Sequence, residues 1–165
     1  MPNESDDRPG PLDSEKLRWQ WDDADDSRVA TGIAGGGSVS FEPAGEGFAV
    51  RADPSGSPAW TYAISDGTDA ASLVADGQAV YVALYRGQVS GARMLALDPA
   101  TGRPLWEVLL LGLGPLHHSK YANRVQLRLI GGRVVAFGNE SGRRYIEARD
   151  PHDGALIAHR VVSRV

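Results

Sequence analysis

The sequence predicts an all-β fold made of about three repeated, four-stranded antiparallel units, and three observations carry this prediction. Short apolar segments rich in Val, Ile, Leu, Tyr and Trp recur along the chain, and none shows a sustained helical period with caps. The chain holds 20 glycines and 10 prolines, which is typical of a protein with many turns. One turn motif occurs three times at nearly equal spacing.

The repeated turn motif begins with an Asp-Pro pair. The pairs start at Asp53, Asp98 and Asp150, so they are 45 and 52 residues apart. Four-stranded β-propeller blades are roughly 40–50 residues long. We therefore predict about three propeller blades, which form a partial propeller because closed rings have roughly four to eight blades. A β-sandwich also contains short strands, but it has no reason to repeat one turn motif.

Each unit is expected to hold four strands in the same order. The predicted strands are 29–33, 39–41, 48–52 and 59–64 in the first unit, 71–75, 79–84, 93–97 and 105–110 in the second, and 125–130, 133–137, 144–149 and 156–162 in the third. Before them, residues 1–15 are predicted to be a disordered acidic leader, and residues 16–165 the repeat domain. Residues 16–21 resemble the closing strand of a preceding blade, because Trp19 or Trp21 could occupy the place of Trp60.

The second copy of the motif runs from Ala96 to Trp106 and fits the pattern Ala-x-Asp-x-x-Thr-Gly-x-x-x-Trp at every specified position. It resembles the tryptophan-docking motif of the quinoprotein-like (pyrroloquinoline quinone repeat) β-propeller family. That family includes quinone-dependent alcohol dehydrogenases and non-catalytic propellers such as the outer-membrane assembly lipoprotein. In such a motif an Asp satisfies backbone donors of the turn, a glycine supplies a positive φ, and the indole packs against the neighbouring blade.

The resemblance implies a structural docking role for nine residues: Asp53, Gly56, Trp60, Asp98, Thr101, Gly102, Trp106, Asp150 and Gly154. The first copy is one residue shorter between its Asp and its Gly. The third copy has Asp153 in place of the threonine and Ala158 in place of the tryptophan, so we expect its docking contact to be weaker.

The residues needed for several chemistries are missing from the sequence. The chain has no cysteine, which excludes disulfides, thiolate metal sites and a cysteine nucleophile. The quinone site of the dehydrogenases includes a vicinal disulfide, and their ring has about eight blades, so the resemblance does not extend to the cofactor. The acidic run 22–26 lacks the glycine and closing glutamate of a calcium loop, and Gly35–Gly37 lacks the lysine and helix of a phosphate loop. We expect no cofactor, no metal and no catalytic residue.

The connection between the second and third units is the candidate binding site. It gathers polar side chains in a long loop, on the face where propellers usually bind ligands: His117, His118, Lys120, Tyr121, Asn123 and Arg124. Two interpretations stay open: an anion- or partner-binding loop, and a long exposed connection whose side chains satisfy local backbone groups. A zinc site is disfavoured, because adjacent histidines rarely chelate one metal together. His152 and His159 are predicted to be surface residues.

Charge is unevenly distributed along the chain. Residues 1–26 carry a net charge of −6 and residues 117–165 a net charge of +5. The arginines of the C-terminal third are spread along strands, so we predict no nucleic-acid surface. The longest apolar run, 108–116, contains two glycines and is too short to span a membrane. No signal peptide is visible, so the compartment stays open: the bacterial periplasm or cell envelope if a leader was removed, and otherwise the cytoplasm.

These observations favour a non-enzymatic binding or scaffold module for a protein partner, or for a second copy of the chain. Two copies would supply six blades, a ring size that propellers adopt. Two alternatives stay open. One is a fragment or subunit of a quinoprotein-like dehydrogenase, and the other is a sensor that reads a small anion through Lys120 and Arg124.

Overall fold

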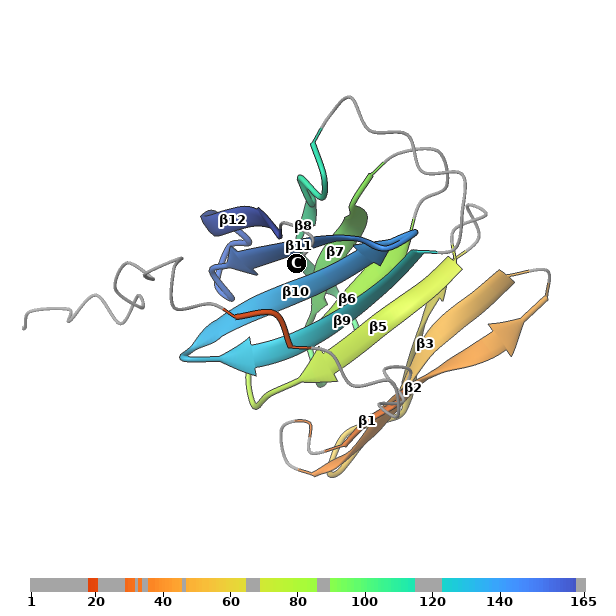
Figure 1. Ribbon diagram of the computed structural model, residues 1–165. Helices are drawn as coiled ribbons and strands as arrows, with labels where there is room; N and C mark the ends of the chain where they lie inside the picture. Colours follow the sequence, from red (N-terminus) through yellow and green to blue (C-terminus); the bar gives the residue numbers. More distant parts are fainter. Residues whose placement is uncertain are drawn as a thin grey trace, which may run out of the picture.

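The computed structural model describes residues 18–20, 29–31, 33, 36–45, 47–64, 69–85, 90–114 and 123–162. The regular structure in these residues is entirely β, with strands arranged in three four-stranded antiparallel sheets (Figure 1). The all-β fold class and the division into about three blades are therefore confirmed. No helix long and apolar enough to cross a membrane is present in the described part of the chain.

Within the described ranges, twelve strands follow one another in chain order. The first blade holds β1 (Val29–Thr31), β2 (Gly37–Ala44), β3 (Gly47–Pro54) and β4 (Trp60–Ile64). The second holds β5 (Asp69–Ala75), β6 (Val80–Tyr85), β7 (Ala92–Leu97) and β8 (Pro104–Leu109). The third holds β9 (Asn123–Ile130), β10 (Arg133–Glu140), β11 (Arg143–Arg149) and β12 (Leu156–Val162). Each sheet is a simple meander, so its first and last strands are its edges.

The three sheets are arranged as consecutive propeller blades. β1 lies beside β5, and β5 lies beside β9, so the first strand of each blade is on the inner side of the array. The last strands β4, β8 and β12 form the outer edges (Figure 1). Every predicted strand is present, and the main difference is that β2 and β3 extend to a hairpin in which Ala44 pairs with Gly47.

Two apolar cores fill the junctions between the blades. Val80, Val82 and Leu84 of β6 pack against the first blade, whereas Tyr81 and Ala83 pack against the third. Because side chains alternate along a strand, a strand covered on both faces must be apolar at every position. β6 is buried throughout, which explains its continuous apolar sequence.

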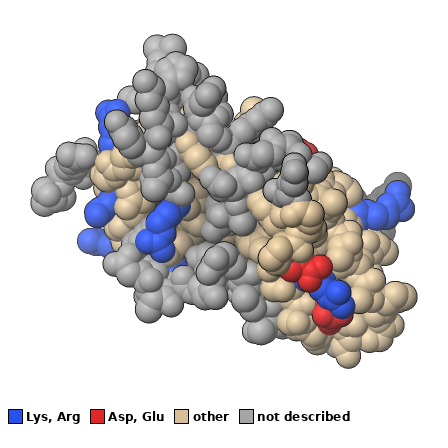
Figure 2. All heavy atoms as spheres, turned by 90° about the vertical axis from the view of Figure 1, so that its right-hand side faces the viewer, with Lys and Arg blue, Asp and Glu red and all other residues tan. Residues whose placement is uncertain are grey.

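The outward flank of the first blade is polar. Ser40 pairs with Arg51, and Arg51 pairs with Thr61, so these side chains lie on one face of the sheet. Arg51 also lies 3.4 Å from Asp53, which raises the pKa of its guanidinium through a hydrogen bond. Acidic and basic side chains lie next to each other in one patch of the face shown in Figure 2, among mostly uncharged surface. Arg51 and Thr61 are exposed on this flank.

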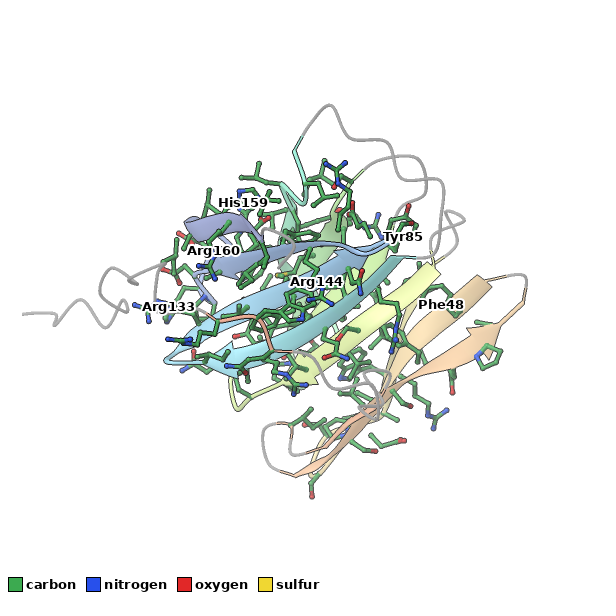
Figure 3. The ribbon with its side chains drawn as sticks, viewed as in Figure 1. Phe48, Tyr85, Arg133, Arg144, His159 and Arg160 are labelled. Atoms are coloured by element: carbon green, nitrogen blue, oxygen red, sulfur yellow. The ribbon has the colours of Figure 1, made fainter. Side chains whose placement is uncertain are left out.

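The outward flank of the third blade is apolar at its centre. Val135, Phe137, Ile146 and Ala148 form a buried cluster there, and Trp19 packs on it. Arg144 and Arg160 belong to the same blade (Figure 3). The expectation that residues 16–21 close a preceding blade is corrected at Trp19, because residues 18–20 form no strand and the indole lies on the third blade. The first blade offers only a polar flank, whereas the third offers an apolar one that can receive an indole.

Candidate functional site

The turn between β7 and β8 presents a carbonyl and a bare Cα to the preceding blade. Asp98 Oδ1 accepts hydrogen bonds from the amides of Ala100 and Thr101 at 2.8 and 3.2 Å. Gly102 has a φ of 75°. Trp60 Nε1 donates to the carbonyl of Pro99 at 2.8 Å, and a Cβ at position 102 would stand 2.4 Å from Trp60 Cε3. Only a glycine at this position lets the indole approach so closely.

The third blade repeats this arrangement one blade later. Trp106 Nε1 donates to the carbonyl of Pro151 at 2.9 Å, and a Cβ at Gly154 would stand 2.6 Å from Trp106 Cε3. Asp153 Oδ1 accepts the amide hydrogen bond of Ala155 at 2.9 Å. The hydroxyl of Thr101 accepts the corresponding bond in the second blade at 3.3 Å, so Asp153 reproduces the contact of the residue that it replaces.

The first blade has the turn without a described indole on it. Gly56 has a φ of 79°, and a Cβ there would meet no described atom within 4 Å. Asp53 lies in β3, and its carboxylate pairs with Arg51. The contribution of the docking residues to stability stays a prediction.

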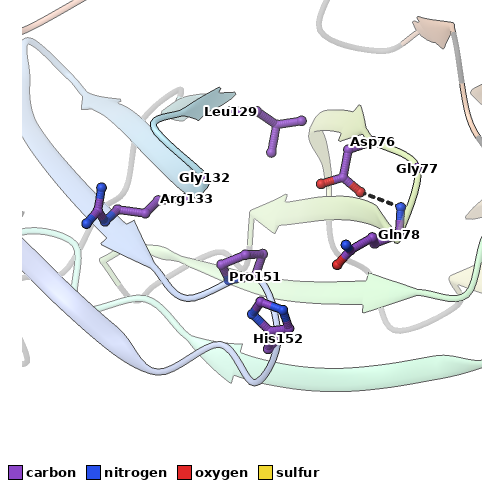
Figure 4. A pocket seen from close by; sticks show the side chains of 8 residues that line it. All are labelled: Asp76, Gly77, Gln78, Leu129, Gly132, Arg133, Pro151 and His152. Atoms are coloured by element: carbon purple, nitrogen blue, oxygen red, sulfur yellow. Dashed lines mark hydrogen bonds between the residues drawn. The ribbon is translucent and has the colours of Figure 1, made fainter. Parts of the chain in front are cut away.

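A groove with a volume of about 530 Å³ opens beside the docking turn of the third blade (Figure 4). Its walls come from three turns of two blades, β5–β6, β9–β10 and β11–β12, and are lined by Asp76, Gly77, Gln78, Leu129, Gly132, Arg133, Pro151 and His152. The carbonyl of Pro151 also accepts the hydrogen bond of Trp106. The groove is therefore built directly on the blade junction.

Three of the polar side chains that line the groove, those of Asp76, Arg133 and His152, make hydrogen bonds within their own turns. Asp76 Oδ1 accepts the amide hydrogen bonds of Gln78 and Ala79 at 2.8 and 2.9 Å, and burial together with Asp76 raises the pKa of the Tyr81 phenol. Arg133 donates to the carbonyl of Gly131 at 3.1 Å. His152 Nδ1 lies 3.0 Å from Asp150 Oδ1.

The groove consequently offers a partner a concave apolar surface and few side chains that are available for chemistry. Leu129 is 38 % exposed beside it, and Pro151 forms part of its wall. No group of three His, Asp or Glu side chains that could hold a metal ion occurs within the described ranges.

A buried carboxylate joins the end of the second blade to the third. Glu147 is 0 % exposed, and its Oε1 accepts the amide hydrogen bonds of Leu111 and Gly112 at 2.8 and 3.2 Å. Its Oε2 pairs with Arg149, whose guanidinium also donates to the carbonyl of Gly154 at 3.1 Å. One network therefore fixes both the start of the connection and the docking turn.

A second buried carboxylate holds the neighbouring loop. Glu140 accepts hydrogen bonds from the amide of Gly91 at 2.6 Å and from the hydroxyl of Ser90 at 2.7 Å. The Ser90 hydroxyl in turn accepts the amide of Leu113 at 2.7 Å. His159 Nε2 lies 2.6 Å from the carbonyl of Gly112. The start of the predicted binding loop is thus anchored at several points.

Sequence reasoning did not identify these buried carboxylates or the groove. Strand alternation could have indicated that Glu147 is buried. Glu147 pairs with Ala136, so the two side chains lie on the same face of the sheet, and Ala136 packs against the second blade. The groove gave no sequence signal, since its residues come from turns far apart in the chain.

Most of the predicted loop site cannot be placed. His117, His118, Lys120 and Tyr121 lie outside the described residues, whereas Asn123 begins β9 and Arg124 follows it on that strand. The binding role of this loop stays a prediction. The structure brings His152 to Asp150 in its own turn, and it brings His159 to the carbonyl of Gly112 at the start of the connection.

The family described as outer membrane protein assembly factor BamB matches residues 11–164, almost the whole chain. The chain belongs to this family. The match confirms the resemblance that the turn motif carried, and it makes the chain a BamB-like propeller of pyrroloquinoline quinone repeats. No curated protein matches the chain.

Three solved structures are similar to this BamB-family chain. BamB from Moraxella catarrhalis is 22 % identical, with a TM-score of 0.47 over 75 % of this chain and 35 % of that one. The quinohemoprotein alcohol dehydrogenase ADHIIG from Pseudomonas putida HK5 is 18 % identical, with a TM-score of 0.52 over 87 % of this chain and 22 % of that one. Its counterpart from Comamonas testosteroni is 18 % identical, with a TM-score of 0.51 over 87 % of this chain and 23 % of that one.

These similarities concern the fold. The chain spans between about a fifth and about a third of the length of the structures that it matches. One fold can serve several functions, so function has to be argued from the sites of this chain.

Proposed function

We propose that the chain is a non-enzymatic scaffold module and that the groove between its second and third blades holds a segment of a partner protein. The observation that carries this proposal is that the ionisable side chains of the groove make hydrogen bonds within their own turns. A catalytic site needs groups that converge on the reacting atoms. Here Asp76, Arg133 and His152 each make a local hydrogen bond, and Leu129 and Pro151 supply apolar surface.

The rigidity of the groove supports the same proposal. Its walls are short turns, and the junction beneath them is fixed by Trp106 and by the network of Glu147 and Arg149. A preorganised surface loses little conformational entropy when a partner binds. Asp76 and Arg133 lie on opposite sides of the groove (Figure 4), so it favours a segment that carries an apolar residue between polar groups.

A different protein is favoured as partner over a second copy of the chain. Ring completion by two copies would bring the polar flank of the first blade against the apolar flank of the third. Such a contact buries Arg51 and Thr61 against Phe137 and Ile146 and leaves their polar groups without water. The family description, an outer membrane protein assembly factor, agrees with a scaffold that contacts other proteins.

Site-specific photo-cross-linking tests the groove. A photoreactive residue is placed at Leu129 in one variant and, as a matched control, at the exposed Thr61 of the first blade in another. We expect a discrete cross-linked protein at position 129, identified by mass spectrometry, and none of it at position 61. Identical products at the two positions, or none at position 129, would contradict the proposal.

Calorimetry separates the scaffold from the dehydrogenase. The chain is titrated with pyrroloquinoline quinone and Ca²⁺, separately and together. The scaffold proposal predicts no saturable heat. Stoichiometric quinone binding that requires Ca²⁺ would instead support a piece of a dehydrogenase.

A further inference from the structure

The outward flank of the third blade combines an apolar centre with arginines around it. Residues that pair directly in an antiparallel sheet point to the same face. Phe137 pairs with Ile146, and Ile146 pairs with Arg160. In the next row, Val135 pairs with Arg128 and with Ala148. We call this face, defined by these six residues together with Arg144, the third-blade flank.

Trp19 lies on the third-blade flank. Its ring meets Phe137 edge-on, with centroids 5.9 Å apart and planes at 79°. The guanidinium of Arg144 stands 5.0 Å from the centroid of the Trp19 ring. The red segment at residues 18–20 crosses the blue strands of this blade in Figure 1. An indole gains from both contacts, because an edge-to-face aromatic pair and a cation over the ring are each favourable.

The indole occupies the place that a following blade takes at the other junctions. On the first blade, Val39 is buried by the second blade, and on the second blade, Tyr81 is buried by the third. On the third blade, Val135 and Phe137 are equally buried, and the packing partner described from outside the blade is Trp19. Trp19 therefore substitutes for side chains of a next blade.

The positive charge of the third-blade flank indicates which segment it binds. Residues 1–26, which contain Trp19, carry a net charge of −6, whereas the flank presents Arg128, Arg144 and Arg160. We propose that the third-blade flank is a binding surface for a tryptophan within an acidic segment, and that Trp19 of the same chain, with Glu15 and Asp22 as its nearest carboxylates in the sequence, occupies it as an intramolecular cap. The cap covers an apolar surface that would otherwise favour association. This inference does not depend on the groove.

A peptide competition tests the cap in the full chain. The probe is a fluorescently labelled peptide of residues 13–26, and the proteins are the wild type, Trp19→Ala and the matched control Trp21→Ala. Because a tethered segment has a high local concentration, we expect the peptide to bind Trp19→Ala at least about 10-fold more tightly than the other two. The same peptide with Trp19→Ala should not bind, and added salt should weaken the binding. Equal binding to all three proteins, or none to Trp19→Ala, would overturn the proposal.

A second measurement does not depend on the folding of Trp19→Ala. The chain is labelled with 5-fluorotryptophan, and the ¹⁹F resonance of Trp19 is assigned with Trp19→Phe. The cap predicts a Trp19 resonance shifted from its unfolded position that moves in Arg144→Ala, while the other resonances stay. A Trp19 resonance at the unfolded position would overturn the cap.

Sedimentation separates the intramolecular cap from exchange between copies. The cap predicts a monomeric wild type and a Trp19→Ala variant whose mass increases with concentration. A wild-type dimer that Trp19→Ala dissociates would show that the indole binds a neighbouring copy, and it would overturn the intramolecular proposal.

Discussion

The indole of Trp106 lies against the bare Cα of Gly154, and a Cβ at that position would stand 2.6 Å from Trp106 Cε3. The same relation joins Trp60 to Gly102 one blade earlier. The first and second blades thus each contribute an indole to the turn of the following blade, and that turn offers a glycine and a proline carbonyl in return. The contact between consecutive blades therefore needs a tryptophan in one blade and a glycine in the turn of the next.

Alanine at the docking glycines measures this contact. Gly102, Gly154 and Gly56 have φ values of 75°, 76° and 79°, so alanine brings the same backbone strain of about 1–2 kcal/mol at each. Only Gly102 and Gly154 also have an indole against them. We expect Gly102→Ala and Gly154→Ala to lower the free energy of unfolding by about 2 kcal/mol more than Gly56→Ala, measured by urea denaturation. Equal losses at the three positions would show that the indole contact is unimportant.

Neutralising Glu147 tests the buried network. Glu147→Gln leaves the guanidinium of Arg149 buried without its carboxylate, so we expect a loss of about 3–5 kcal/mol in the free energy of unfolding. Glu107→Gln is the control, because Glu107 pairs with Arg93 at 3.4 Å with its side chain 47 % exposed. The control should change stability by less than about 1 kcal/mol. Similar effects of both variants would contradict a structural role for the network.

The sequence predicted what depends on local patterns. Strand alternation and the glycine-rich turns placed all twelve strands, and the Asp-Pro motif indicated the blades, because both signals lie within a few neighbouring residues. The burial of Glu147 required knowing which face of β11 meets the second blade. The position of Trp19 depended on the polar outward flank of the first blade and the apolar outward flank of the third. These flanks become apparent only once the strands are assembled into sheets. The groove combines three distant turns and has no local signature.

Removing the hydroxyl of Tyr145 should not harm the fold. The Tyr145 ring fills the space above Gly138, where a Cβ would stand 2.0 Å from Tyr145 Cε1. Its hydroxyl is buried without a hydrogen-bond partner among the described residues. Because an unsatisfied buried hydroxyl costs free energy, we expect Tyr145→Phe to leave stability unchanged or to raise it by about 1 kcal/mol. A loss above that size in thermal unfolding would mean that the hydroxyl has a partner.

The same tyrosine predicts alkaline sensitivity. Burial, reinforced by Glu140 and Glu147, raises the pKa of the Tyr145 phenol well above its ordinary value near 10. As the pH rises above about 10, the unfolded chain loses this proton first, so the folded state becomes less stable by up to about 1.4 kcal/mol per pH unit. Urea denaturation from pH 9 to pH 11 should show this fall in the wild type and a smaller one in Tyr145→Phe. Parallel profiles would contradict the assignment.

If an indole packed on a glycine joins consecutive blades, nuclear magnetic resonance should detect that contact. We expect nuclear Overhauser effects from the Trp60 ring to the Gly102 Hα protons and from the Trp106 ring to those of Gly154, with ring-current shifts at both glycines. Ordinary glycine shifts at positions 102 and 154, without cross-peaks to the indoles, would contradict it.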